Sequence, residues 1–298
     1  MGSGIAVTLR DVRKSFGTKR VLESISGDIE FGKVVGLLGR NGEGKTTLFK
    51  IMLDMLIPDH GTISVLGLCP DGTGSIRQAV GYIPERPVFH DFMMVEDVLK
   101  WRAAFFSKWN WIKAYKICAN LDLDLKTPVK GASKGTLAKT SWVCATAHNP
   151  ELLLFDEPTS GLDAVVRDSV LNEFISELSE EKKTIIVANH HMDEMAGILD
   201  EIWILADGHI REKHLISTLR KHSFRITGRL KNNLTLPEMM LYEENRTGDL
   251  VQWLTISPDT VTKIQELGLL DPLHLEPLSL DVAFKLLLKS QGERSSTS

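Results

Sequence analysis

Residues 39–47 read GRNGEGKTT and fit the pattern G-x-x-x-x-G-K-[ST] at Gly39, Gly44, Lys45 and Thr46. Glycines allow successive backbone N–H groups to point at phosphate oxygens, a lysine adds a mobile positive charge, and a threonine hydroxyl can bind Mg²⁺. The pattern therefore predicts a site for a nucleoside triphosphate. A strand-to-helix turn without a ligand is the alternative, but such a turn would not need Lys45.

A pair of acidic residues follows an apolar run in ELLLFDEPTSGLD, residues 151–163. The run reads as a buried strand, so Asp156 and Glu157 would stand at its carboxyl end, on the same sheet edge as the phosphate loop. We expect Asp156 to hold Mg²⁺ through its water shell, and Glu157 to orient and deprotonate an attacking water. The alternative is that two acids merely mark the end of a strand.

Two further stretches could carry chemistry. GASKGT, residues 131–136, reads either as a solvated polar turn or as a second phosphate-binding loop. VANHHMDE places His190 and His191 just after a predicted strand. The histidines of the chain lack the spacing that is typical of a zinc site.

The elements that must position these residues follow from the hydrophobic pattern. Short apolar runs alternate with amphipathic segments over about the first 210 residues, which predicts a mostly parallel sheet covered by helices. The expected strands are residues 34–38, 63–66, 80–83, 152–155, 184–188 and 202–205. A helix that follows the phosphate loop and ends before Pro58 is expected to bury Leu48, Ile51, Met52 and Met55. Residues 95–147 read as helical throughout and predict an inserted helical subdomain.

The pattern changes from about residue 215. Strands are expected at 224–226 and 251–256, with a helix from Ser257 and Pro258 to near Gly268 and a last helix from Ser279. We expect a first domain at 1–215 with its helical subdomain at about 88–147, a small α+β domain at 216–290, and a disordered tail at 291–298.

Composition narrows the class of protein. The chain has 298 residues, 43% hydrophobic and 25% charged, which suits a globular protein. Its formal charge is −4 and its basic residues are spread out, so we expect no nucleic-acid partner. Cys69, Cys118 and Cys144 are expected to be reduced packing residues. Because no apolar stretch approaches the roughly 20 residues that cross a bilayer, any link to a membrane is expected to come through a partner.

The phosphate loop, ASKGT, LLLFDEP, SGLD and VANHHMDE occur in this order and resemble the ATP-binding subunit of ABC transporters over roughly residues 5–215. The resemblance implies an α/β fold, a P-loop ABC ATPase core with a mostly parallel sheet, an antiparallel β edge and a helical subdomain. The Ser-Lys-Gly form of the second glycine loop resembles an exporter branch that includes bacitracin-resistance and sodium-extrusion-like systems. The ending PLSLDVAFKLLLK is similar to exporter-type members and favours export.

The resemblance also implies roles for individual residues. Phe16 would stack on adenine, although a half-buried strand residue is the alternative. The triphosphate would be bound by Gly39, Asn41, Gly42, Gly44, Lys45, Thr46 and Thr47. Mg²⁺ would be held by Thr46, Asp156 and Glu85, the last standing where many members have glutamine. Catalysis would depend on Glu157, Lys45 and His190, which the spacing favours over His191.

Ser133 and Gly135 are implied to grip the γ-phosphate bound by a second subunit, and Asp163 to lie at the interface between the two subunits. Lys134 stands where the family has glycine, and Thr136 where it has glutamine. We expect Lys134 either to add a cation that aids ATP-driven closure or to be a solvated side chain. The residues after this loop, LAKTSWVCATAHNP, depart from the family's arginine-rich helix, which lowers the turnover that we expect.

Together these features predict a homodimeric ATPase on the cytoplasmic side of a membrane, bound around two MgATP and driving a separate permease. Dense aromatics in the helical subdomain either pack in its core or contact a short helix of that permease; they are Trp101, Phe105, Phe106, Trp109, Trp111 and Tyr115. A soluble ABC ATPase would be expected to carry two cassettes or a long coiled coil. A regulator that binds ATP without hydrolysing it would be expected to lack Glu157, His190 or Ser133.

Overall fold

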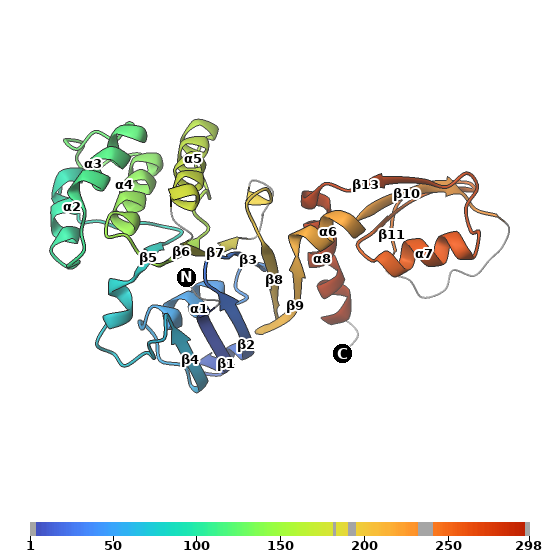
Figure 1. Cartoon of the computed structure of the whole chain (residues 1–298), viewed down its shortest axis with the longest axis horizontal. Coiled ribbons are helices and arrows are strands. Elements are labelled where there is room, and N and C mark those ends of the chain that lie inside the picture. The colour runs from blue at the N-terminus through green and yellow to red at the C-terminus, as the bar shows by residue number, and fades with distance from the viewer. Residues whose placement is uncertain (1–3, 181–182, 190–194, 232–240, 296–298) are drawn as a thin grey trace. The chain divides into compact units, whose positions relative to one another are not determined.

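The computed structural model describes residues 4–180, 183–189, 195–231 and 241–295 (Figure 1). The chain forms two compact units, one of Met1–His190 with Leu205–Arg211, and one of His191–Ile204 with Glu212–Ser298. None of the helices in the described ranges is both long enough and apolar enough to cross a membrane.

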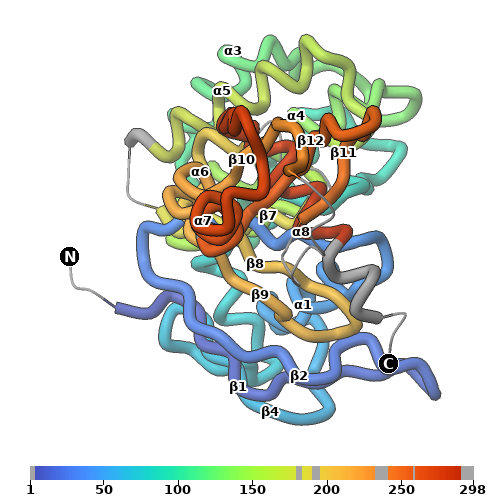
Figure 2. Tube along the Cα trace, turned by 90° about the vertical axis from the view of Figure 1, so that its right-hand side faces the viewer, coloured from blue at the N-terminus to red at the C-terminus, as the bar shows by residue number. Residues whose placement is uncertain are grey.

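A nine-stranded sheet has the order β4-β1-β2-β9-β8-β3-β7-β6-β5. Its strands are β1 Ile5–Phe16, β2 Lys19–Glu30, β3 Val34–Leu38, β4 His60–Val65, β5 Val80–Ile83, β6 Leu152–Asp156, β7 Thr184–Asn189, β8 Glu201–Ala206 and β9 His209–Leu215. Strands β3, β7, β6 and β5 run parallel to one another, whereas β1 is antiparallel to β2 and β4, with which it lies side by side in Figure 2. The predicted mixed sheet with an antiparallel edge is confirmed.

The apolar runs form the centre of this sheet as expected. Every residue of β3, β6 and β7 is buried, which is the pattern of parallel strands covered on both faces. In register, Leu38 of β3 pairs with Asn189 of β7 and Asp156 of β6 pairs with Ala188. The carboxyl ends of these strands therefore meet at one edge.

Helix α1, Lys45–Met52, follows the phosphate loop and is shorter than predicted. Leu48, Ile51 and Met52 are buried, but Met55 lies beyond the helix and is 57% exposed. Asp54 has a left-handed backbone, with φ of 55°, and its carboxylate accepts hydrogen bonds from the Gly72 and Gly74 amides. That turn, favoured for aspartate, ends the helix before Met55 can join its apolar face.

The expected helical insertion contains three helices, α2 Val95–Ala103, α3 Trp111–Asn120 and α4 Lys134–Thr146, but non-helical segments separate them, so the stretch is not helical throughout as predicted. Asn110 and Ser133 cap α3 and α4, each accepting a backbone N–H at 3.0 Å. Between α3 and α4, Asp122 is left-handed and Pro128 lacks an N–H donor, so the chain cannot remain helical there.

Helix α4 is anchored by aromatic packing. The ring of Trp142 lies 5.1 Å from that of Phe155 in β6 and 6.3 Å from that of Phe174. Phe174 belongs to α5, Ala164–Glu180, and the three side chains are almost completely buried. The second glycine loop is thus attached through α4 to the strand that ends at Asp156.

A buried charged cluster joins α3, α5 and the start of β7. Lys113 of α3 lies 2.7 Å from one carboxylate oxygen of Glu177 in α5, and Lys183 contacts the other oxygen. The side chains of Glu177 and Lys183 are 4% and 3% exposed. Burial lowers the pKa of Lys113, and the contact with Glu177 opposes that shift.

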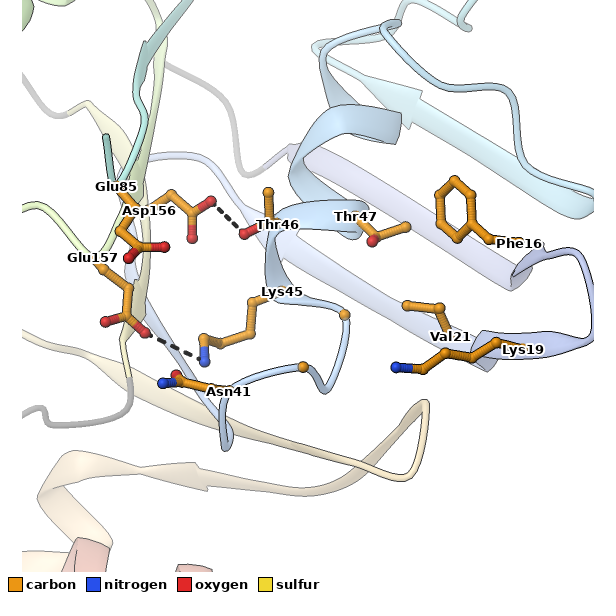
Figure 3. A pocket seen from close by; sticks show the side chains of 12 residues that line it. Phe16, Lys19, Val21, Asn41, Lys45, Thr46, Thr47, Glu85, Asp156 and Glu157 are labelled. Carbon is orange, nitrogen blue, oxygen red and sulfur yellow. Dashed lines mark hydrogen bonds and ion pairs between the residues drawn. The ribbon is translucent and has the colours of Figure 1, made fainter. Parts of the chain in front are cut away.

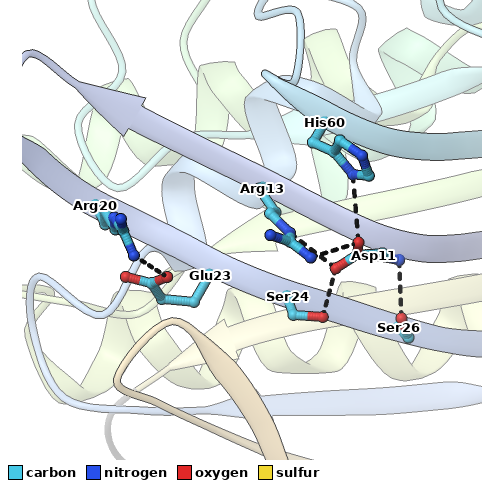
Figure 4. A network of polar contacts seen from close by, with 7 residues as sticks. All are labelled: Asp11, Arg13, Arg20, Glu23, Ser24, Ser26 and His60. Atoms are coloured by element: carbon cyan, nitrogen blue, oxygen red, sulfur yellow. Dashed lines mark hydrogen bonds and ion pairs between the residues drawn. The ribbon is translucent and has the colours of Figure 1, made fainter.

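An exposed polar network stabilises a bulge in the antiparallel edge (Figure 4). Asp11 is left-handed with φ of 48°, and its carboxylate accepts from Nε and Nη2 of Arg13 and from the Ser24 hydroxyl. His60 lies 3.3 Å from the same carboxylate. The bond from Arg13, then that from Ser24, lowers the pKa of Asp11 to about 2.

The second unit contains a four-stranded antiparallel sheet of order β11-β12-β10-β13. Its elements are α6 Ile216–His222, β10 Phe224–Arg229, β11 Tyr242–Thr247, β12 Leu250–Thr255, α7 Pro258–Glu266, β13 His274–Pro277 and α8 Leu280–Ser295. Ile226, Trp253 and Ile264 share its hydrophobic core. Residues 291–295, expected in a disordered tail, belong to α8, since the favourable helix propensities of Gln291, Glu293 and Arg294 allow the last helix to continue.

The buried cluster gives a first prediction. Glu177→Gln removes the negative charge shared by two ammonium groups, so we expect the free energy of unfolding to fall by about 3–5 kcal/mol. Glu96→Gln is the matched control, because it breaks an exposed i,i+4 pair with Lys100 and should cost less than about 1 kcal/mol. Urea unfolding of both variants tests this, and equal losses would refute the role of burial.

The Asp11 network gives a second prediction. We expect the Asp11 carboxyl to titrate near pH 2 and Arg13→Leu to raise its pKa toward about 4, the ordinary value for aspartate. Because the folded pKa is depressed, the network stabilises the fold above about pH 4 and this contribution is lost as the pH falls through the folded pKa. Carboxyl NMR titration measures the shift, and an unchanged pKa in the Arg13 variant would contradict the assignment.

Candidate functional site

A cavity of about 400 Å³ lies over the phosphate loop in the first unit (Figure 3). It is lined by Phe16, Lys19, Val21, Asn41, Gly42, Gly44, Lys45, Thr46, Thr47, Glu85, Asp156 and Glu157. The volume falls in the range of small-molecule sites. Ten of these twelve lining residues were predicted from the sequence as site residues, and the exceptions are Lys19 and Val21.

The phosphate loop has the backbone that its glycines allow. Gly44 precedes α1 with φ of 102°, and a Cβ there would lie 2.7 Å from a methyl carbon of Leu22. Gly39 does not line the cavity, but a Cβ on it would lie 2.6 Å from the carbonyl oxygen of Leu205. The first turn of α1 contains no acidic residue, so its N-terminal amides and macrodipole favour an anion.

Lys45 lies at the floor of the cavity. Its ammonium nitrogen donates to the carbonyl oxygens of Gly39 at 2.7 Å and Arg40 at 3.2 Å. It also lies 3.5 Å from a carboxylate oxygen of Glu157, and the two side chains are only 6% and 8% exposed. A buried positive charge is therefore held next to the carboxylate predicted to act as the base.

Thr46 and Asp156 meet beside this pair, as Figure 3 shows. The Thr46 hydroxyl donates to Asp156 at 2.6 Å, and the Tyr82 hydroxyl donates to the same carboxylate oxygen at 3.4 Å. Burial raises the pKa of Asp156, while the bond from Thr46 opposes the shift. Burial, followed by the nearby charge of Asp156, raises the pKa of Tyr82.

The donor set fits Mg²⁺. Thr46, Asp156 and Glu85 present hydroxyl and carboxylate oxygens to one cavity, and Mg²⁺ prefers oxygen ligands. Within the described ranges, no three His, Cys, Asp or Glu residues gather into a metal cage. A magnesium ion commonly lacks such a cage, because it keeps several waters and binds substrate phosphates.

Glu157 adopts an uncommon backbone conformation directly after β6. Its φ is 51°, a left-handed value that non-glycine residues rarely adopt. The Glu157 amide donates to Ala188 of β7 at 2.8 Å, and its carbonyl accepts from the Ser160 amide at 3.1 Å. This turn directs the Glu157 carboxylate toward Lys45, and such strain is typical of functional sites.

The end of the cavity away from Glu157 is lined by aromatic and aliphatic side chains. Phe16 ends β1 and is 49% exposed, with the Lys14 ammonium 5.7 Å from its ring centroid. Val21 and Lys19 lie beside it on β2 (Figure 3). Sequence reasoning missed Lys19, although a basic residue close after Phe16 in the chain was the available signal. The cavity thus offers a ring surface at one end and charged groups at the other.

The second glycine loop does not line this cavity. Ser133 is exposed, and its hydroxyl accepts from the Thr136 amide as the cap of α4. A Cβ on Gly135 would lie 2.9 Å from a methyl carbon of Val166. Asp163 caps α5 through the Val166 amide. The predicted site residue His190, like its neighbour His191, lies outside the described residues.

The aromatics of the helical subdomain divide between core and surface. Phe106 is buried and stacks on His148 with ring centroids 3.9 Å apart, and burial lowers the pKa of His148 to about 4. An exposed aromatic patch is formed by His90, Phe92, Trp101 and Phe105. The ring of His90 contacts those of Phe92 and Trp101, and the ring of Trp101 contacts that of Phe105. Phe92 is 82% exposed.

Comparison with known proteins identifies the family. The sequence pattern described as ABC transporter matches residues 22–160. An uncharacterized ABC transporter ATP-binding protein of Methanocaldococcus jannaschii is 33% identical over 211 residues, covering 68% of this chain and 74% of that protein. The bacitracin transport ATP-binding protein BcrA of Enterococcus faecalis is 32% identical over 226 residues, covering 74% of this chain and 73% of that protein.

A solved structure agrees with these relatives. The structure of an ATP binding subunit of an ABC transporter matches with a TM-score of 0.65 at 25% identity, covering 72% of this chain and 92% of that chain. The predicted α/β fold and the resemblance to bacitracin-resistance systems are therefore confirmed. The chain belongs to the ATP-binding proteins of ABC transporters, a family of ATPases.

Proposed function

We propose that this chain binds and hydrolyses MgATP as half of a dimer and so drives a separate membrane permease. The observation that carries the proposal is the meeting of two pairs, Lys45 with Glu157 and Thr46 with Asp156, in one cavity. Together they provide a cation for phosphate oxygens, ligands for Mg²⁺ and a carboxylate base, the parts that phosphoryl transfer to water requires.

Each group has a distinct task in this mechanism. Phe16 offers a ring face for adenine at one end of the cavity. The amides of the phosphate loop and Lys45 bind the phosphates, while Thr46, Asp156 and Glu85 would hold Mg²⁺, which neutralises phosphate charge when bound. Glu157 orients the attacking water and accepts its proton.

A second copy of the chain completes the proposed site. Ser133 and Gly135 do not line the cavity that contains Lys45, yet they stand at the N-terminus of the 13-residue helix α4, where an anion is favoured. We assign them to the γ-phosphate bound by the other subunit, with Asp163 at the interface. His190 remains proposed as the residue that bridges this phosphate and Glu157.

The exposed aromatic patch supports a permease partner. Its four residues follow Glu85 in the chain, within residues 90–105. Exposed aromatics are common anchors of protein interfaces. The chain would then lie at the cytoplasmic face of the membrane. The bacitracin transport relative and the exporter-like ending support export as the direction.

Replacement of the base tests the ATPase. Glu157→Gln keeps the shape of the side chain but removes its basicity, so we expect kcat to fall by about 100-fold or more. Because unhydrolysed ATP holds the two subunits together, MgATP should shift this variant from monomer to dimer. Glu151→Gln, an exposed residue preceding the same strand, should retain activity. Light scattering with MgATP or EDTA measures the dimer, and its failure to form would undermine the mechanism.

Substitution in the exposed aromatic patch tests the partner. Phe92→Ser with Trp101→Ser removes two apolar anchors, and at about 1.4 kcal/mol per tenfold change we expect at least about tenfold less chain to co-purify with a multi-span protein from membranes. ATPase activity of the isolated chain should not change. Ile112→Ser is the control, since Ile112 is 84% exposed on α3 outside the patch. If wild type, the double variant and Ile112→Ser co-purify with the multi-span protein in equal amounts, the patch is not the contact.

A further inference from the structure

A second cavity of about 410 Å³ lies where two loops and the start of helix α4 meet in the first unit. Its walls are residues 83–87, the first turns of α4, and the loop 158–162 that follows Glu157. Lys134 is one of the residues that line it. The cavity therefore brings the Glu85 segment and the second glycine loop together with the segment that carries Glu157.

The side chain of Lys134 lies against Gly161 of that loop. A Cβ on Gly161 would be 3.4 Å from the Lys134 ammonium nitrogen and 4.0 Å from its Cδ, so both the stem and the head of the lysine adjoin this glycine. Gly161 has φ of 71°, which also favours glycine. A Cβ at this position would be in ordinary van der Waals contact with the Lys134 side chain.

The residue after Lys134 makes a second contact with the same region. Gly135 packs against Val166 in the first turn of α5, and the 158–162 loop leads directly into that turn. Helices α4 and α5 lie beside each other in Figure 1. The first turn of α4 therefore contacts both the loop and the helix that the loop enters, within a single chain.

The other end of the loop is the proposed base. Only three residues separate Glu157 from Gly161, and the Ser160 amide bonds to the Glu157 carbonyl while the Leu162 amide bonds to Thr159. Asp163 fixes the far end by capping α5. Because this loop is short and internally hydrogen-bonded, a displacement at Gly161 must also displace Glu157.

We propose that Lys134 is a positioning residue that holds the 158–162 loop, and through it the Glu157 carboxylate, of its own chain. An effect of Lys134 on hydrolysis rests on the proposed function, because it requires that Glu157 is the base of an ATPase. When the second glycine loop of one chain contacts the phosphate bound by the other chain, Lys134 would then also adjust the position of Glu157 in its own chain. This role differs from that of a cation for the γ-phosphate, because the aliphatic stem contributes to it.

Steady-state kinetics separate the two roles. We expect Lys134→Ala to lower kcat by about five- to tenfold with KM for ATP within about twofold, as for loss of an interaction that acts on the transition state. Lys134→Met keeps the stem and should retain more than half of kcat. Lys130→Ala, an exposed lysine of the same loop region, is the control. If Ala and Met equally weaken ATP-stabilised dimers in the Glu157→Gln background, with kcat intact, Lys134 binds phosphate instead.

A double-mutant cycle tests the contact itself. Gly161→Ala places a methyl group against Lys134, so we expect the loss of kcat in Lys134→Ala with Gly161→Ala to be smaller than the product of the two single losses. A double variant whose loss equals that product would mean that the two positions act independently and would overturn the proposal.

A measurement without ATP keeps the inference separate from the proposed function. Hydrogen exchange of a peptide spanning residues 158–163 reports the opening of the loop, including its bonded Ser160 and Leu162 amides. Lys134→Ala should speed this exchange by about threefold or more, and Lys130→Ala should not. An unchanged rate refutes the positioning role even in an active ATPase. An inactive wild-type protein with the expected exchange would refute only the proposed function.

Discussion

The arrangement of the site depends on one buried ion pair, between Lys45 and Glu157, whose side chains are less than a tenth exposed. Removing two charges from water is costly unless each finds close partners. Lys45 finds them in two carbonyl oxygens of its own loop and in Glu157. The parallel register of β3, β7 and β6 is what allows this, because it ends the phosphate-loop strand and the Glu157 strand at one edge.

The helix after the second glycine loop illustrates how packing can replace charge. Where the resemblance implied an arginine-rich helix, α4 has Trp142, which forms a mutual aromatic cluster with Phe155 and Phe174. Phe155 immediately precedes Asp156 in β6, so this aromatic cluster fixes the helix directly on the strand that bears the acidic pair. Because protein interiors are close-packed and transmit strain, this buried contact couples the position of α4 to that of β6.

How much could be predicted from sequence depends on whether a signal is local. Continuous apolar runs identified β3, β6 and β7 to within one residue at each end, and the glycine pattern identified the phosphate loop. Strands β1 and β2 were not located, because their mixed polar and apolar residues face solvent on one side and lack a continuous run. The breaks at Asp122 and after Met52 were missed because they depend on left-handed turns.

Long-range side-chain contacts are the part of the site that sequence could not supply. The contact of Lys134 with Gly161 and that of Gly135 with Val166 join segments far apart in the chain and follow from tertiary packing. Residue type alone favoured a solvated or phosphate-binding role for Lys134. The fold adds a contact that residue type does not indicate: α4 approaches α5 so closely at Gly135 that a Cβ there would lie 2.9 Å from a methyl carbon of Val166, and the stem of the neighbouring Lys134 lies against Gly161.

The number of hydrogen-bond donors on Lys45 suggests how nucleotide entry and the base are connected. An ammonium group has three N–H donors, and the carbonyl oxygens of Gly39 and Arg40 accept two of them. The remaining donor faces the region shared with Glu157. A terminal phosphate that enters the cavity would compete with Glu157 for that donor, because a charge-assisted bond to phosphate is strong. The carboxylate that pairs with Lys45 in this structure would then turn from the ammonium group to the attacking water when phosphate is present.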